Sequence, residues 1–301
     1  MTEHDHVWQQ ISALLKHASN SVILIAPFIK KPIFEAAVDA IPASVETIRC
    51  VTRWTPAEVA AGVSDPEIME VAERDKRVRV MLCPTLHAKI YAADDYCLIG
   101  SANLTGKATG RVPGANIELL IKVATAHPEV QRVLGHVESI ARSASLELAA
   151  IVRRQANLLE ETGAASSVPD VESKAAALWY PNTRRPENLY ALYNGRGSFA
   201  AAVEAGIIED LALLDIPAGL DESDFHAAVR SRLGEIPELQ RLQAGHNLSS
   251  TELQKAIAER SGASEGLARR RTENIAAWLQ YFDRYYTEVD TWALRPGREL
   301  T

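Results

Sequence analysis

One stretch of the sequence combines a histidine, a lysine and small polar residues at short spacing. His87 and Lys89 are two residues apart in a segment typical of a strand, so both side chains should project from the same face. An apolar run then leads to Gly100, Ser101 and Asn103. A histidine can act as a nucleophile, and a fixed ammonium or amide can stabilise developing negative charge. These residue types together indicate chemistry at a phosphodiester.

The pattern resembles the signature of the phospholipase D superfamily, in which His-x-Lys-x4-Asp is followed by Gly-Ser-x-Asn. The residues that match in type and spacing are His87, Lys89, Asp94, Gly100, Ser101 and Asn103. The gap between Asp94 and Gly100 is one residue shorter than is usual in the family, which indicates a shorter hairpin. Farther along, Asn116–Ile117–Glu118 resembles a strand that often carries a supporting acid in this family.

The resemblance implies a two-step displacement at phosphorus that requires no metal and no cofactor. His87 would attack the phosphodiester and form a phosphohistidine, and a second histidine would protonate the leaving oxygen and later activate water. Lys89 and Asn103 would hold the non-bridging oxygens, with Ser101 nearby.

Two acidic residues have supporting roles in the same scheme. Glu118 is the candidate that orients a histidine by accepting its ring N–H. Asp94, although it belongs to the signature, is expected to brace the hairpin more than to touch substrate. The alternative interpretation of the whole stretch is that His87 and Lys89 are structural residues on an ordinary strand edge.

The scheme needs two histidines, but the chain has a single His-x-Lys. None of the other histidines is followed two positions later by lysine: His4, His6, His17, His127, His136, His226 and His246. A single copy resembles the small bacterial nucleases of this superfamily that complete the site with a second subunit. Because a symmetric dimer brings the same patch of both protomers together, we predict one composite centre per homodimer.

The composition is that of a globular protein in a reducing compartment. The chain of 301 residues is 47% hydrophobic and 24% charged, with a net charge of −7. It has no apolar run long enough to cross a membrane and no secretory signal at its start, so a cytoplasmic location is expected. Cys50, Cys83 and Cys97 are expected to be buried thiols. No second ligand pair with zinc spacing follows Cys83 and His87, so no metal site is expected.

Alternating strands and helices in residues 1–155 predict an α/β fold, a mixed-sheet sandwich like that of phospholipase D. The expected strands are 21–29, 47–53, 78–82, 87–93, 96–99 and 117–123. The expected helices include 7–17, 32–41, 56–61, 66–74 and 127–143.

Residues 156–175 are expected to form a linker, and residues 176–301 a mainly α domain. Between 178 and 196, aromatic residues are interleaved with Arg184, Arg185 and Arg196, a pattern that suits either stacking on nucleic acid or a small core. A capping box at Ser249 and Glu252, then a turn at 261–264, predict helices over 249–260 and 265–285. This pair fits a helix-turn-helix or winged helix that binds nucleic acid through Arg269, Arg270 and Arg271, or alternatively a helical hairpin that packs or dimerises.

The leading interpretation is therefore a metal-independent endonuclease, of restriction or phage-defence type, that acts on DNA more than on RNA. A helicase or another defence protein is an expected partner by analogy with related systems. One rival interpretation is a catalytically silent subunit that binds DNA or joins a defence complex. The other is a phosphodiesterase that acts on phospholipids.

Overall fold

The chain forms two units that we describe separately. The computed structural model describes residues 6–163, 179–283 and 293–294. Within them, the first unit contains residues 6–160 and also the short segment 217–219, and the second contains 161–163, 179–216, 220–283 and 293–294. The segment 217–219 joins the first unit because the Ala218 N–H donates to the Trp54 carbonyl over 2.8 Å and Ala218 lies in the same apolar core as Trp54.

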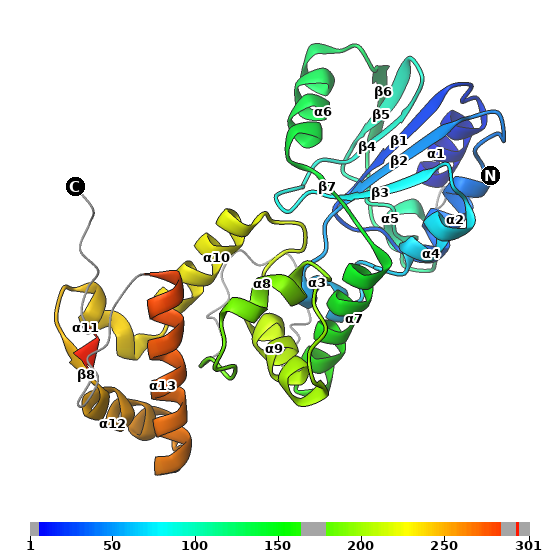
Figure 1. The fold of residues 1–301 in the computed structure, drawn as a ribbon. Helices are drawn as coiled ribbons and strands as arrows, with labels where there is room; N and C mark the ends of the chain where they lie inside the picture. Colours follow the sequence, from blue (N-terminus) through cyan, green and yellow to red (C-terminus); the bar gives the residue numbers. More distant parts are fainter. Residues whose placement is uncertain (1–5, 164–178, 284–292, 295–301) are drawn as a thin grey trace. The chain divides into compact units, whose positions relative to one another are not determined.

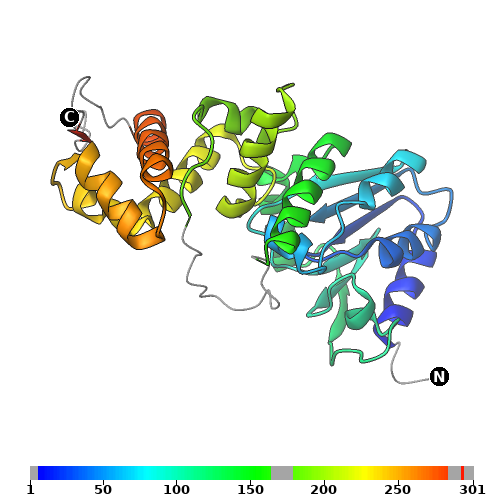
Figure 2. The same cartoon turned by 90° about the horizontal axis from the view of Figure 1, so that it is seen from below.

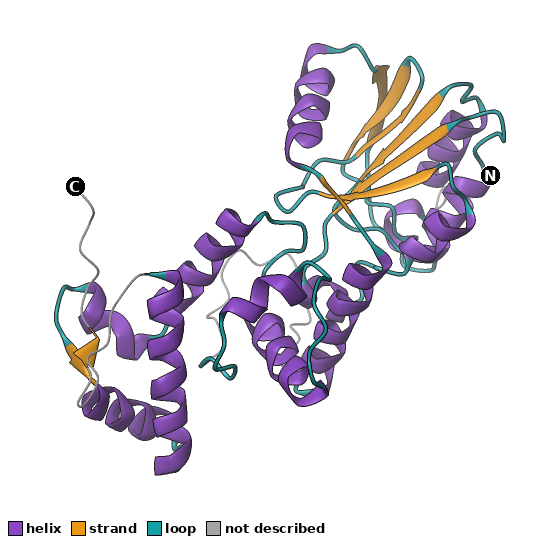
Figure 3. Cartoon of the chain, in the orientation of Figure 1, coloured by secondary structure: helices purple, strands orange, loops and turns teal. Residues whose placement is uncertain are grey.

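The first unit is built on one seven-stranded mixed sheet, which confirms the predicted α/β class (Figures 1 and 3). The strand order is β6-β5-β4-β1-β2-β3-β7. The three central parallel strands are β1 (Ser21–Ile25), β2 (Thr47–Thr52) and β3 (Val78–Leu82). The antiparallel strands are β4 (Ile90–Ala93), β5 (Tyr96–Gly100), β6 (Leu120–Ala124) and β7 (Arg142–Ser143).

Helices cover both faces of this sheet (Figure 1). One face packs against α1 (His6–Lys16), α2 (Lys31–Asp39), α4 (Ile68–Arg74), α5 (Gly106–Thr109) and α7 (Leu146–Glu161). Among the described helices, only α6 (Pro128–Ile140) packs against the other face. The short helix α3 (Pro56–Ala60) follows β2. The thiols Cys50, Cys83 and Cys97 are free and buried, as the sequence predicts.

Several elements start or end at different residues from those that the sequence predicts. Strand β1 stops at Ile25 rather than at residue 29, because Pro27 has no N–H to continue the ladder. Residues 87–89 and 117–119 precede β4 and β6 rather than belonging to them. The predicted helix 127–143 ends at Ile140, and Arg142–Ser143 instead pairs with β3. The predicted linker 156–175 begins inside α7, which continues to Glu161, and residues 164–178 lie outside the described residues.

The described residues of the second unit form helices and two short strands (Figure 2). Its helices are α8 (Glu187–Tyr193), α9 (Ala201–Leu214), α10 (Glu222–Gly234), a 3-10 turn (Pro237–Leu239), α11 (Gln240–Gln243), α12 (Ser250–Ser261) and α13 (Glu265–Phe282). Strands β8 (Leu248–Ser249) and β9 (Ala293–Leu294) pair antiparallel.

The aromatic segment at the start of this unit forms its core. Trp179 and Tyr180 are buried, and the Trp278 indole N–H donates to the Thr183 carbonyl over 2.8 Å. The buried Asp210 carboxylate accepts the backbone N–H groups of Asn182 and Thr183, although burial raises its pKa to about 7. Because these rings are inside, the structure favours the core interpretation over stacking on nucleic acid.

The paired helices near the C-terminus begin where the sequence predicts. Ser249 and Glu252 form the capping box that starts α12, and Gly262 ends α12 in a left-handed conformation (φ 65°). Ser264 then caps α13. Helix α13 ends at Phe282, and residues 284–285 of the predicted helix lie outside the described residues.

Candidate active site

The polar residues of the signature gather at one end of the sheet. The parallel strands β1, β2 and β3 end there. Of the antiparallel strands, β5 also ends there, whereas β4 and β6 start there. The register pairs Ile90 with Ile99 and Gly100 with Leu120. The residues that this topology brings to the same end are His87, Lys89, Ser101, Asn103 and Glu118. Ligands of open α/β sheets commonly bind at the carboxyl ends of such strands.

Ser101 and Glu118 form a hydrogen-bonded pair across the start of β6. The Ser101 hydroxyl donates to one Glu118 oxygen, and the Asn116 amide donates to the other over 3.1 Å. The Leu119 backbone N–H in turn donates to the Ser101 hydroxyl over 3.1 Å. Ser101 and Asn116 thus hold the Glu118 carboxylate in place, and its role in orienting a histidine stays a prediction.

Asn103 is fixed through its carbonyl oxygen. That oxygen accepts the Phe28 backbone N–H over 3.4 Å, just beyond the end of β1. The Asn103 NH₂ group makes no hydrogen bond with another described residue. It can therefore donate to an anionic oxygen at this end of the sheet.

His87 and Lys89 lie on the segment that leads into β4. The His87 side chain is exposed and makes no hydrogen bond with another described residue. The Lys89 ammonium is partly buried and donates to the His87 carbonyl over 2.8 Å. An exposed imidazole beside a held ammonium has the chemistry of a nucleophile next to a charge-stabilising donor.

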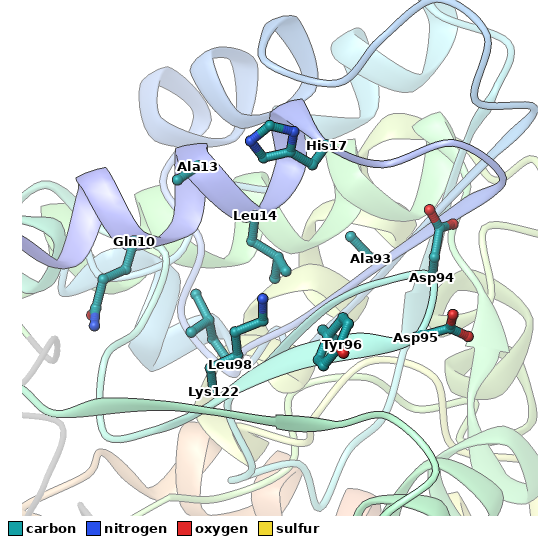
Figure 4. A pocket seen from close by; sticks show the side chains of 10 residues that line it. All are labelled: Gln10, Ala13, Leu14, His17, Ala93, Asp94, Asp95, Tyr96, Leu98 and Lys122. Carbon is teal, nitrogen blue, oxygen red and sulfur yellow. The ribbon is translucent and has the colours of Figure 1, made fainter.

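Asp94 lies at the opposite end of β4 (Figure 4). Its carboxylate accepts the backbone N–H groups of Ser19, Asn20 and Ser21 over 2.7, 3.0 and 3.0 Å. Burial raises the pKa of Asp94, but these three donors outweigh that effect and lower the pKa overall. Asp94 therefore ties the hairpin to the start of β1 and is not part of the candidate active site.

Arg53 also contributes to the site, although the sequence analysis does not identify it. Its guanidinium donates to the Leu86 carbonyl over 3.0 Å, one residue before His87, and lies 5.5 Å from the centre of the Phe28 ring. A partly buried ion pair with Glu58 holds it in place. Arg53 thus fixes the backbone beside His87 and packs on the residue whose N–H holds Asn103.

The three consecutive arginines of α13 have different surroundings in the second unit. Arg269 is exposed and pairs with Glu273 at 3.7 Å. Arg270 is exposed and makes no ion pair with a described residue. Arg271 donates to the Ser261 hydroxyl over 3.0 Å and lies 4.8 Å from the centre of the Tyr180 ring.

Among the described residues, no cluster of three or more His, Cys, Asp or Glu side chains could hold a metal ion. No described helix is both long and apolar enough to cross a membrane.

Several solved structures are similar to this chain. NucT from Helicobacter pylori is 11% identical, with a TM-score of 0.36 over 46% of this chain and 88% of NucT. Nuc from Salmonella typhimurium, described as a phospholipase D family member, is 15% identical, with a TM-score of 0.35 over 48% of this chain and 93% of Nuc. Phosphatidylserine synthase from Haemophilus influenzae is 11% identical, with a TM-score of 0.34 over 56% of this chain and 44% of the synthase.

One of these structures, Nuc, is described as a phospholipase D family member, the family that the sequence pattern resembles. No family model matches the sequence, and no curated protein matches it either. The low identities and TM-scores carry no argument about activity or substrate. Those conclusions depend on the residues of the site.

Proposed function

We propose that the chain is a phosphodiesterase that hydrolyses nucleic acid, DNA in preference to RNA, as an endonuclease of restriction or phage-defence type. The observation that carries this proposal is the convergence of complementary groups at one end of the sheet: His87, Lys89, Asn103, Ser101 and Glu118. Together they supply a nucleophile and donors to developing charge, which phosphoryl transfer requires.

The proposed reaction has two steps at phosphorus. The His87 imidazole attacks, an N–P bond forms, the P–O bond to the leaving oxygen breaks, and a second histidine gives that oxygen a proton. Water then attacks phosphorus and gives its proton to the second histidine while the N–P bond breaks. Lys89 and Asn103 donate to the non-bridging oxygens in both steps. The Glu118 carboxylate, fixed by Ser101 and Asn116, accepts the ring N–H of one histidine.

The second histidine comes from a second copy of the chain. Two histidines of the first unit lie elsewhere: His17 lines a cavity beside Asp94, and His127 follows β6 at the end remote from the site. In a symmetric dimer, the partner subunit's His87 supplies the missing group, so that two chains share one centre.

The helix pair α12 and α13 is the proposed DNA-binding element, which favours a nucleic acid over a phospholipid substrate. The two helices meet at a tight turn, and strands β8 and β9 pair beside α12. Exposed Arg269 and Arg270 lie in the N-terminal part of α13, the part of a recognition helix that enters the major groove.

A single nuclease assay tests the proposal. Purified protein is incubated in EDTA with plasmid, with RNA and, separately, with a fluorescent phospholipid. We expect cleavage of plasmid, and loss of cleavage in His87→Ala, because that variant removes the nucleophile. Lys89→Ala and Asn103→Ala should each lose at least ~10²-fold in rate, the scale for one oxyanion donor. His17→Ala is the matched control and should retain activity, because His17 lies at the other end of the sheet.

Each alternative gives a different result in this assay. Hydrolysis of the phospholipid alone would indicate a lipid phosphodiesterase. Binding of plasmid without cleavage, by folded wild-type protein, would indicate a silent DNA-binding subunit. Full activity in His87→Ala, or a strict requirement for added Mg²⁺, would overturn the proposed mechanism.

A further inference from the structure

A cavity of about 450 Å³ lies between α1 and the strands β4, β5 and β6 (Figure 4). This volume is within the range of sites that bind small molecules. Along β5 the cavity extends from Tyr96, at the end of the strand remote from Ser101, to Leu98, which pairs with Lys122 of β6. None of the residues that line the cavity belongs to the candidate active site.

Lys122 brings a positive charge into this cavity without a counter-ion. Its ammonium lies 4.1 Å from the centre of the Tyr96 ring, a cation–π contact that holds it in place. It forms no ion pair with a described residue. Figure 4 shows the Lys122 side chain extending from β6 toward α1, with Leu14 opposite its ammonium. The ammonium can therefore pair with an anionic group of a ligand in the cavity.

Gln10 lines the cavity with an amide that lacks a partner. The amide oxygen is buried, yet it accepts no hydrogen bond from a described residue. A buried acceptor without a donor is unfavourable, so it commonly indicates a group that a water or a ligand satisfies. Gln10 lies one helical turn before Leu14 on α1, and in Figure 4 it lies on the same side of the cavity as Lys122. A ligand N–H or O–H at this side can donate to the amide oxygen.

The acidic residues of the lining determine which end of a ligand carries negative charge. Asp94 and Asp95 line the end of the cavity that is remote from the Lys122 ammonium (Figure 4). Both carboxylates would repel an anionic group at that end. Apolar and aromatic side chains lie between the two ends: Ala13, Leu14, Ala93, Tyr96 and Leu98.

We propose that this cavity binds an aromatic organic anion. The anionic group pairs with Lys122, the ring system packs against Leu14 and Leu98, and a ligand N–H or O–H donates to the Gln10 oxygen. A nucleic acid strand fits the cavity less well, because binding to a phosphate backbone uses several lysines and arginines and this lining has one lysine. The inference does not depend on the proposed function.

The first test uses anilinonaphthalene sulfonate, an aromatic anion with one N–H, whose fluorescence rises when it binds apolar surface. The full chain should bind this probe saturably. Lys122→Met removes the charge but keeps an apolar side chain over Tyr96, and should weaken binding about tenfold or more, the scale for a lost hydrogen bond to a charged group. Lys16→Met is the matched control, because Lys16 is an exposed lysine of α1 outside the lining, and should leave the affinity unchanged.

The second test uses N-phenylnaphthylamine, which has the same ring system without the sulfonate. The wild type should bind it about tenfold more weakly than the sulfonate, and Lys122→Met should bind the two probes equally well. Leu14→Trp fills the cavity, so this variant should bind neither probe while keeping the circular dichroism spectrum of the wild type.

Three results would overturn the inference. The first is a wild type that binds the sulfonate weakly and without saturation. The second is an unchanged affinity for the sulfonate in Lys122→Met, which should fold normally because Lys122 is exposed, and this result would place the probe elsewhere on the chain. The third is an equal affinity of the wild type for both probes, which would show an apolar site with no preference for anions.

Discussion

At the scale of single residues, the structure separates Asp94 from the signature residues that lie at the candidate active site. Asp94 matches the family spacing, yet its carboxylate accepts three backbone N–H groups far from His87. It also adopts a left-handed backbone (φ 51°), a conformation that Asp and Asn tolerate better than most residues. Its role is to close the hairpin between β4 and β5.

We predict that Asp94→Asn lowers the free energy of unfolding by about 1–2 kcal/mol at pH 7, because a neutral amide accepts these bonds less strongly. The folded-state pKa of Asp94 is lowered, so its contribution is present above the unfolded pKa and is lost as pH falls through the folded pKa. The difference from wild type should therefore shrink below about pH 4 in urea titrations.

The neighbouring residue provides the control for this prediction. The Asp95 side chain is exposed and bonds to no described residue, so Asp95→Asn should change stability by less than about 0.5 kcal/mol. Equal effects of the two substitutions would show that the backbone bonds to Asp94 do not stabilise the fold.

The signature residues could be predicted because their spacing is local, whereas Arg53 could not. Its contact with the Leu86 carbonyl joins residues 33 positions apart. That contact exists only because the Cys83 N–H bonds to the Thr52 carbonyl where β2 and β3 end. Nothing in the local pattern around Arg53 distinguishes it from a surface arginine.

At the scale of elements, the packing of β6 against β5 explains why the Gly-Ser-x-Asn segment begins with a glycine. A Cβ atom on Gly100 would lie 1.8 Å from the Leu119 carbonyl oxygen, so β6 can approach β5 only beside a glycine. This close approach also places the Leu119 N–H against the Ser101 hydroxyl.

We predict that Gly100→Ala destabilises the protein by about 1–3 kcal/mol, the usual cost of overpacking, and separates Ser101 from Glu118. Gly135→Ala is the control, because Gly135 lies in α6 with no atom within 4 Å of a Cβ. The control should gain about 0.5–1 kcal/mol through helix propensity. The midpoints of denaturant unfolding curves measure both stability changes. A Gly100→Ala protein as stable as the wild type would contradict the close approach of β6 to β5.

Most strands of the sheet could be predicted from the sequence, because they are apolar runs that lie buried in the sheet. Strand β3 has the predicted bounds, and β2 ends one residue early. The errors at 87–89 and 117–119 share one cause. In both segments the strand-like alternation of side chains starts before the hydrogen bonds between strands begin. Ile117 and Leu119 have the pattern of a strand but are exposed. Periodicity indicates which residues are apolar, not what covers them.

At the scale of the whole molecule, the three arginines of α13 differ in their surroundings and should therefore differ in their effects on binding and on stability. We predict that Arg269→Ala/Arg270→Ala weakens DNA binding and lowers the log–log salt slope by about one for each lost phosphate contact. Arg271→Ala should leave the slope unchanged and instead lower stability, because Arg271 is held by Ser261 and Tyr180. Fluorescence anisotropy at several salt concentrations measures the slopes.

An unchanged slope in the double variant would favour the alternative in which α12 and α13 form a hairpin that packs or dimerises. In that case plasmid cleavage in concentrated substrate should also be unaffected, since His87 and Lys89 belong to the first unit.

The short segment 217–219 delays the completion of the first unit during synthesis on the ribosome. Ala218 lies in the same core as Trp54, and Gly219 lies against Leu82, so that core lacks a piece until residue 219 has been synthesised. At about 5–20 residues per second, the nascent chain waits roughly 3–12 s between residue 160 and that point. During this interval α8 and α9 are translated, so a chain whose synthesis stops within them has a first unit that lacks its final core residues.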